Sequence, residues 1–188
     1  MIDTDKVVAS KIPKWRYDEI EKKVVDLYIE QDIHSFPLDP FKILEKRGYK
    51  LIPFSKFGIE ACPELVNDDN DAFSFYSPEY KTHLIIYNDE KPLPRIRFTL
   101  MHELGHIDLG HKGESDLARR EADAYAGYAL APSPLISKYA SEDAFEIMSA
   151  FWVSRECADV RSYSYTNWKQ YGGRYLKDYE IVLVNLFK

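Results

Sequence analysis

Several features that would place this chain in a special class of protein are scarce. Its 188 residues include only two cysteines, Cys62 and Cys157, which lie far apart and match no metal-binding spacing. Two unpaired thiols in a reducing cytoplasm are therefore expected, with a single disulfide as the alternative. Long apolar runs are also missing, and residues 1–15, MIDTDKVVASKIPKW, contain none. The sequence thus predicts no signal peptide, no membrane span and a cytoplasmic location.

Excess positive charge is absent as well. The chain has 25 Lys and Arg against 31 Asp and Glu, which gives a net charge of −6 and an isoelectric point near 5.4. Proteins that bind nucleic acid by themselves usually present a basic face. The sequence therefore predicts no direct binding to nucleic acid, and a partner that contacts DNA must bring that affinity itself.

The composition that remains is typical of one globular domain. Hydrophobic residues make up 45% of the chain and aromatic residues 14%, which is enough for a core at this length. There is no internal repeat, low-complexity tract or linker. We therefore expect a single α+β domain over residues 1–188.

The spacing of apolar and turn residues predicts a mainly helical domain with a small antiparallel sheet before the histidine-rich helix. The pattern predicts helices over Lys14–Gln31, Pro40–Gly48, a segment ending near Leu109, Ser115–Ala131, Glu142–Trp152 and Ser154–Tyr165. It predicts strands over Tyr49–Phe54, Ala72–Tyr76, His83–Tyr87 and Ile181–Phe187. The second and third strands form a hairpin, and residues 55–70 form an acidic loop.

The segment FTLMHELGHIDLGH, from Phe98 to His111, contains three of the five histidines. His102 and His106 are four residues apart and so share one helix face, where two imidazoles can bind one zinc ion. Glu103 lies about 100° further round. It can take a proton from a water held by the metal, which is the division of roles in an H-E-x-x-H motif.

The alternative is an ordinary helix that happens to be rich in histidine. The helix is wrapped in apolar residues, which indicates that it is buried. These are Ile96, Phe98, Leu100, Leu104, Ile107 and Leu109. Buried polar groups without partners cost several kcal/mol, so the metal reading is favoured.

Three residues are candidates for the third metal ligand, namely His111, Glu121 and Asp123. On a continuous helix, His111 would lie about 140° away from His106, which predicts a place outside the direct ligands or on the surface. On the next helix, Glu121 falls on the apolar face, where a carboxylate must be paired or bind metal. Asp123 falls outside that face and is expected to orient a ligand or to pair with an arginine. The predicted ligands are therefore His102, His106 and Glu121, with Glu103 as the catalytic base.

Three blocks of the sequence resemble the ImmA/IrrE family of metallopeptidases. RFTLMHELGH starts at Arg97, EADAYAGYALAP starts at Glu121, and FWVSRECADVRSY ends at Tyr163. Tyr125, Ala131 and Arg119 depart from residues that are usual in the family.

The resemblance implies a zincin-like fold with a metal-site core at about residues 82–135, and Zn²⁺ at His102, His106 and Glu121. It also implies a cytoplasmic zinc endopeptidase in a bacterial or prophage setting. The implied substrate is a protein, a helix-turn-helix repressor of a mobile element or stress regulon, and no membrane partner is expected.

Residues 82–87 are predicted to form an edge strand that pairs with an extended substrate. The residues concerned are His83, Leu84, Ile85, Ile86 and Tyr87. The alternative is a strand that is covered on both sides.

Two other functions stay open. In the first, a non-cleaving regulatory or binding module uses zinc structurally, although such a site has no need of Glu103. In the second, residues 151–169 read DNA through Arg155, Arg161 and Lys169. These cations are sparse and lie among acidic residues, which favours amphipathic packing.

The zinc content of two variant proteins distinguishes the roles predicted for Glu121 and Asp123. We expect Glu121→Ala to lose zinc, because a direct ligand is removed, and Asp123→Ala to retain it. Elemental analysis of both purified proteins measures this. Retention by the first protein and loss by the second would exchange the two roles.

Overall fold

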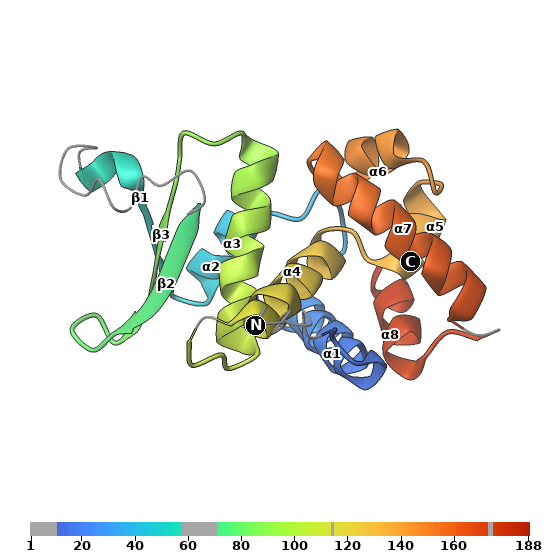
Figure 1. Ribbon diagram of the computed structural model, residues 1–188, viewed down its shortest axis with the longest axis horizontal. Helices are drawn as coiled ribbons and strands as arrows, with labels where there is room; N and C mark the ends of the chain where they lie inside the picture. Colours follow the sequence, from blue (N-terminus) through green and yellow to red (C-terminus); the bar gives the residue numbers. More distant parts are fainter. Residues whose placement is uncertain (1–10, 58–70, 114, 173–174) are drawn as a thin grey trace, which may run out of the picture.

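The computed structural model describes residues 11–57, 71–113, 115–172 and 175–188. The helices are α1 (Lys14–Gln31), α2 (Pro40–Lys46), α3 (Leu93–Asp108), α4 (Asp116–Leu130), α5 (Ser133–Tyr139), α6 (Ala144–Phe151), α7 (Arg155–Tyr171) and α8 (Asp178–Leu186), with a 3₁₀ turn η1 (Phe54–Phe57). The strands are β1 (Lys50–Pro53), β2 (Ala72–Ser77) and β3 (Thr82–Tyr87). Figure 1 shows the sheet on one side of α3 and most of the helices on the other.

The three strands form one mixed sheet in the order β1-β3-β2. β2 and β3 are antiparallel, with Ser74 opposite Ile85, which confirms the predicted hairpin. β1 runs parallel to β3 and pairs Leu51 with Ile85. The sheet is therefore not antiparallel throughout, because the chain leaves β1 and returns through β2 before it forms β3.

The prediction that β3 is an edge strand is wrong. Its backbone is paired with β1 on one side and with β2 on the other. The strand comprises His83, Leu84, Ile85, Ile86 and Tyr87 together with Thr82. The run Leu84–Ile86 is buried, as the apolar centre of a sheet requires. Within the described residues, β2 takes the outer position next to it.

Side-chain caps start several of the predicted helices. Asp39 accepts hydrogen bonds from the backbone N–H groups of Phe41 and Lys42 at 3.1 and 3.3 Å, with Pro40 in the first turn of α2. Ser154 caps α7 in the same way, through the N–H of Cys157. Such caps satisfy backbone donors that a helix start leaves free, so the predicted starts of these helices are confirmed.

Helix ends were harder to predict than helix starts. α7 runs to Tyr171, beyond the predicted end at Tyr165. α4 ends at Leu130, one residue before the predicted end, and Pro132 and Pro134, which follow it, open the short helix α5. Proline fits the first turn of a helix, where its missing N–H has no partner to lose.

The prediction of a C-terminal strand over Ile181–Phe187 is wrong, because the segment lies in and after helix α8. Glu180, Leu183 and Phe187 are buried at helical spacing, whereas Ile181 and Val182 are exposed. The Glu180 carboxylate also accepts hydrogen bonds from the Lys177 N–H at 2.7 Å and from the Trp168 indole N–H at 2.6 Å. Packing and this local bond override the β preference of the valines and isoleucine.

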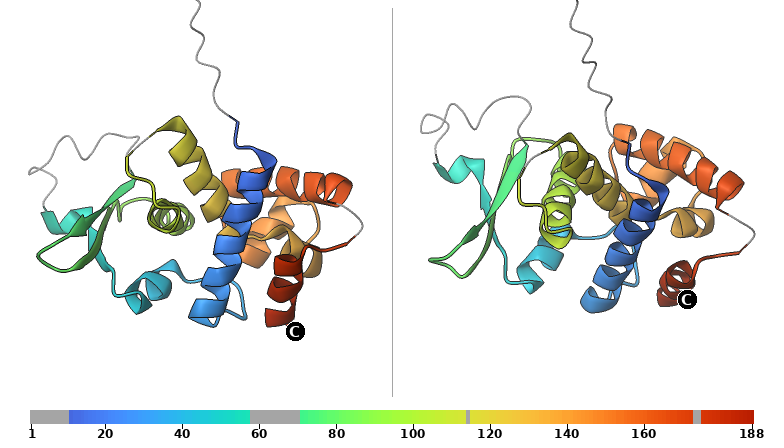
Figure 2. Two further views of the ribbon diagram at one scale, coloured as in Figure 1. Left: turned by 90° about the horizontal axis from the view of Figure 1, so that it is seen from below. Right: turned by 60° about the horizontal axis from the view of Figure 1, so that its bottom comes forward.

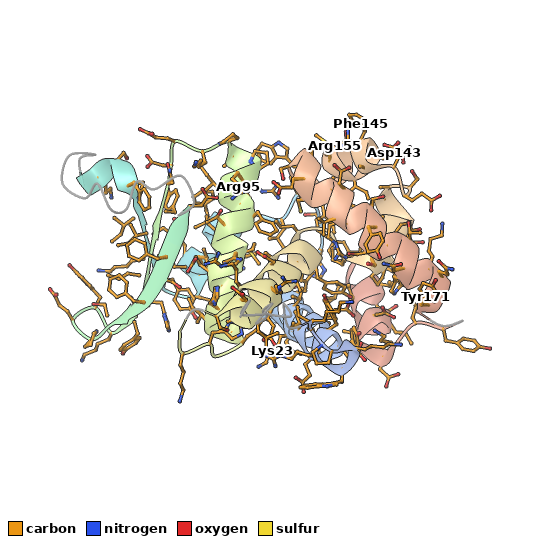
Figure 3. The ribbon with its side chains drawn as sticks, viewed as in Figure 1. Lys23, Arg95, Asp143, Phe145, Arg155 and Tyr171 are labelled. Atoms are coloured by element: carbon orange, nitrogen blue, oxygen red, sulfur yellow. The ribbon has the colours of Figure 1, made fainter. Side chains whose placement is uncertain are left out.

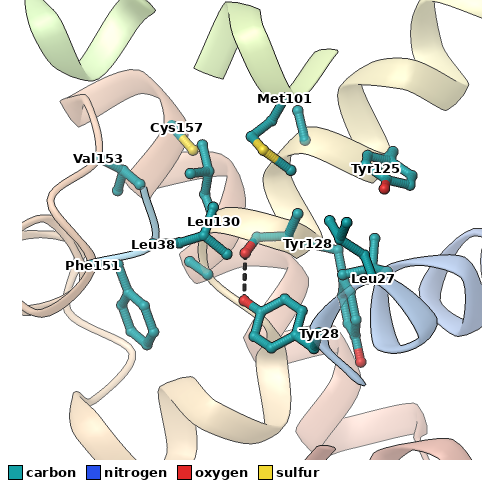
Figure 4. Close-up of a cluster of buried hydrophobic side chains, with 14 of the residues drawn as sticks. Leu27, Tyr28, Leu38, Met101, Tyr125, Tyr128, Leu130, Phe151, Val153 and Cys157 are labelled. Carbon is teal, nitrogen blue, oxygen red and sulfur yellow. Dashed lines mark hydrogen bonds between the residues drawn. The ribbon is translucent and has the colours of Figure 1, made fainter. Parts of the chain in front are cut away.

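One hydrophobic cluster draws residues from α1 to α8, and Figure 4 shows its centre. Tyr28 on α1 is completely buried and donates a hydrogen bond from its hydroxyl to the carbonyl of Ala129 near the end of α4, at 2.6 Å. Figure 2 shows α1 lying between α4 and α8. The first helix is thus fixed to the helix that follows the histidine segment.

Two buried arginines connect segments that are distant in sequence. Arg97 on α3 donates to the carbonyls of Leu38 at 2.6 Å and Phe151 at 3.3 Å, and also to Trp152. Arg161 on α7 donates to the carbonyl of Ala131 at 2.9 Å and to the Ser133 hydroxyl at 3.0 Å. Because both guanidinium groups bind carbonyls at helix ends, we assign them to the architecture of the fold.

Side chains on the surface also form contacts between neighbouring elements. Figure 3 labels Phe145 on α6 and Arg155 on α7, and the guanidinium carbon of Arg155 lies 4.4 Å from the ring centroid of Phe145. Arg95, at the start of α3 in the same figure, forms an ion pair with Asp71, just before β2. No helix in the described ranges is long and apolar enough to cross a membrane.

Cys157 is a free, buried thiol, and burial raises its pKa to about 11. It therefore stays protonated at neutral pH. Cys62 and residues 58–70 of the predicted acidic loop lie outside the described residues.

The bond from Tyr28 supports a stability prediction. Tyr28→Phe leaves the Ala129 carbonyl buried without this donor, and we expect the free energy of unfolding to fall by about 1–3 kcal/mol. Urea denaturation measures the change. Tyr163→Phe is the control, because that side chain is 71% exposed and its hydroxyl bonds to none of the described residues. Equal stability of the two variants would contradict the expectation.

Candidate metal centre

The histidine pair on α3 faces one point. His102 and His106 are one helical turn apart, and their Nε2 atoms are separated by 3.0 Å. Two nitrogens that bind one tetrahedral zinc ion at about 2.0–2.1 Å stand about 3.3 Å apart. The pair therefore fits a shared ion after a shift of about 0.3 Å. The helix is held firmly, since its opposite side is buried in the core.

Asp123 on α4 contacts the other nitrogen of His102. Its Oδ1 lies 2.8 Å from His102 Nδ1, while the Asp123 side chain remains half exposed. A carboxylate in this place fixes the tautomer and the ring orientation of a histidine whose second nitrogen binds metal. The contact is the one that an orienting residue makes.

His111 returns to the histidine pair because α3 ends before it. Gly110 has a φ of +70°, a left-handed conformation that suits glycine and turns the chain back. The His111 N–H then donates to the His106 carbonyl at 3.0 Å, and the Nδ1 atoms of the two rings are also 3.0 Å apart. The angle calculated for a continuous helix does not apply here.

Glu121 is buried on α4, on the apolar face that the sequence predicted. Its Oε2 atom lies 3.0 Å from His111 Nε2 and accepts a hydrogen bond from Arg16 Nη2 at 2.6 Å. The bond from Arg16 lowers the pKa of Glu121 most strongly, burial opposes it, and His111 adds to the lowering. The net effect keeps this carboxylate ionised. Arg16 was not predicted, because 105 residues separate it from Glu121.

The three predicted ligands, His102, His106 and Glu121, do not yet surround a single point. In the ranges that the structure describes, no group of three or more His, Cys, Asp or Glu residues is spaced to hold a metal ion. His102 and His106 contact each other directly, and Glu121 contacts His111, which in turn contacts His106. For Glu121 to join the pair as a third ligand, its carboxylate has to change the contact with His111.

Glu103 lies beside the pair and is 7% exposed. Its Oε2 accepts a hydrogen bond from the Ser74 hydroxyl at 2.6 Å. Ser74 projects from β2 on the face that also carries Ala72 and Tyr76, since strand residues alternate. The sequence alone does not identify Ser74. The one feature that marks it is a small polar residue between the aromatic residues Phe73 and Phe75 of the strand.

A close contact between α3 and α4 sets these positions. A Cβ atom at Gly105 would lie 3.1 Å from Tyr125 Cβ and 3.2 Å from Ala122 Cα. The Tyr125 hydroxyl also donates to Asp108 Oδ2 at 2.6 Å. The Tyr125 hydroxyl, which lies at the buried contact between the two helices, therefore has a hydrogen-bond partner.

A cavity of about 820 Å³ runs past the candidate site between α1, β2, α3, α4 and α7. His102, Glu103 and Asp123 form part of its wall, and Ala72 of β2 forms another part. The volume lies within the range of about 300–1,000 Å³ that ligand clefts usually have. His102 and Glu103 are thus reached from a cleft that β2 borders at Ala72.

The cations of α7 are used within the protein. Arg161 is buried and bonded as described above, Arg155 pairs with Asp159 at 2.9 Å, and Lys169 pairs with Glu142 at 3.0 Å. Arg161 is therefore part of the packing of α7, while Arg155 and Lys169 form ion pairs on its exposed side.

The family described as the IrrE N-terminal-like domain, peptidase family M78, matches residues 54–163. The match contains the histidine helix and α4 and excludes α1 and α2. No curated protein matches the chain.

The α3–α4 contact gives a direct test. Gly105→Leu pushes the two helices apart, and we expect it to destabilise the protein by about 1–3 kcal/mol through overpacking. Gly113→Leu is the matched control, because a Cβ atom there meets nothing within 4 Å. Urea denaturation of both proteins measures the difference. The close packing would be refuted by a Gly105→Leu protein as stable as the control.

Proposed function

The chain belongs to the IrrE N-terminal-like family of metallopeptidases, and on this premise we propose that it is a zinc-dependent endopeptidase. The main observation behind the proposal is that the Nε2 atoms of His102 and His106 lie 3.0 Å apart, with Glu103 directly after His102 in the chain. Two imidazoles and a carboxylate suit zinc, which prefers nitrogen and oxygen donors. We propose His102, His106 and Glu121 as its ligands.

Zinc bound there would acidify a water molecule and polarise the carbonyl of the peptide bond. Glu103 takes the proton from the water and passes it to the leaving amine. Ser74 fixes the orientation of Glu103 through its hydroxyl, at 2.6 Å. Asp123 holds the His102 ring, and the buried side of α3 keeps the base and the histidines in one frame.

The substrate strand is proposed to lie along β2. With β3 in the centre of the sheet, β2 is the strand that borders the cleft and carries Ser74. An extended peptide can add to an outer strand through backbone hydrogen bonds. Phe75 and Tyr76 are 44% and 55% exposed on this strand and offer contacts for substrate side chains.

The proposed target is a helix-turn-helix repressor in the cytoplasm, as the family resemblance implies. The net charge of −6 supports a division of roles in which the repressor supplies the DNA affinity. Cleavage between the DNA-binding and remaining parts of such a repressor would relieve repression.

The test is cleavage of a purified helix-turn-helix repressor, chosen from the genes that neighbour the one for this chain. We expect zinc-loaded protein to cut it, and Glu103→Gln to lower the rate by about 10²–10⁴-fold because proton transfer is lost. Gel electrophoresis measures cleavage, and elemental analysis is expected to find the same zinc content in both proteins.

Glu156→Gln is the matched control, because it removes one carboxylate from the wall of the same cavity without touching Glu103. Its rate should stay close to wild type. If zinc-loaded wild-type protein leaves the repressor intact but still blocks its binding to the operator, the peptidase proposal fails and a non-cleaving binding module is favoured.

A further inference from the structure

Arg16 links the N-terminal helix to the candidate metal centre. It lies in the first turn of α1, and its Nη2 atom donates to Glu121 Oε2 at 2.6 Å. Its Nη1 atom donates to Glu19 Oε2 at 3.0 Å. Because the family match begins at residue 54, Arg16 lies outside the part of the chain that the family describes.

α1 presents this arginine from a fixed support. Ile20, Val24 and Leu27 on the same helix are completely buried. The helix packs along α4, the helix that carries Glu121, and the Tyr28 hydroxyl bonds to the end of α4. Because α1 is fixed against α4, the Arg16 side chain is held beside Glu121.

The ion pair between Arg16 and Glu121 is more buried than an ordinary surface ion pair. The Glu121 side chain is 8% exposed and that of Arg16 is 23% exposed. Surface pairs contribute little, whereas a buried carboxylate needs partners to remain charged. The second contact of the carboxylate, with His111, uses the same oxygen, Oε2.

The other oxygen of Glu121 is unused within the described residues. Arg16 and His111 both contact Oε2, and Oε1 accepts no hydrogen bond from any of the described residues. A carboxylate held through one oxygen keeps the second for a metal ion. Ligating carboxylates are usually hydrogen-bonded in this manner by residues that do not touch the metal.

We propose that Arg16 is a positioning residue of the zinc site, which holds Glu121 through Oε2 so that Oε1 can serve as a ligand. The N-terminal helix is then part of the metal site, which residues 54–163 do not complete on their own. This inference rests on the proposed function, because it requires Glu121 to bind zinc.

The experiment measures the zinc dissociation constant of full-length proteins by competition with a fluorescent chelator. We expect Arg16→Ala to bind zinc about 10–100-fold more weakly, the usual effect of losing a residue that orients a ligand. Arg16→Lys should fall between this variant and wild type, since an ammonium keeps the charge but loses the planar fork of donors.

Two matched controls separate positioning from charge and from the Glu19 contact. Arg120→Ala removes an equal charge from the residue next to Glu121, and Arg120 lines the same cavity without bonding to that carboxylate. Glu19→Gln weakens the other ion pair of Arg16. Both controls are expected to bind zinc within about twofold of wild type, since neither alters a ligand or its direct partner. Circular dichroism checks that every variant is folded, and Arg16→Lys preserves the test should Arg16→Ala fail to fold.

The outcomes distinguish this inference from the proposed function. Zinc binding by Arg16→Ala or, if that protein is unfolded, by Arg16→Lys at wild-type strength or tighter would overturn the inference and leave the peptidase proposal standing. An equal loss in Arg120→Ala would also overturn it, because the effect would then be general charge. Wild-type protein that binds no zinc would overturn the proposed function, and the inference with it.

Discussion

The contact between α3 and α4 at Gly105 is the constraint on which the rest of the centre depends. A Cβ atom at position 105 would lie 3.1 Å from Tyr125 Cβ and 3.2 Å from Ala122 Cα, so glycine lets α4 approach α3 this closely without crowding. The approach places Asp123 against His102 and brings Glu121 within reach of His111. A glycine between two histidines thus decides which carboxylates of the next helix can meet the imidazoles.

The three blocks that resemble the metallopeptidase family also hold one another in place. Gly105 of the first block packs against Tyr125 of the second. Arg97 of the first block binds carbonyls in the third, at Phe151 and Trp152. Arg161 of the third block binds Ala131 of the second. Several residues of the pattern therefore serve the arrangement of helices rather than chemistry, because buried guanidinium groups close the open ends of other helices.

The part of the chain before the family match is tied into the same arrangement. Arg47, just after α2, contacts Asp108 at the end of α3 at 2.5 Å and Glu30 on α1 at 2.6 Å. Asp108 in turn accepts the bond from Tyr125. With Arg16 on Glu121, these contacts join α1 and α2 to both helices that carry the candidate ligands. The N-terminal region therefore contacts these two helices through charged side chains as well as through apolar packing.

The sequence by itself determined the features that depend on near neighbours along the chain. The spacing of His102 and His106, the place of Glu121 on an apolar face and the caps at Asp39 and Ser154 all follow from the period of a helix and the donors at its start. Tertiary structure alone decided the order of the strands, the helical state of residues 178–186 and the partners Ser74 and Arg16. Short apolar runs suit a strand or a helix equally, and contacts across 29 or 105 residues leave no local pattern, so packing made each choice.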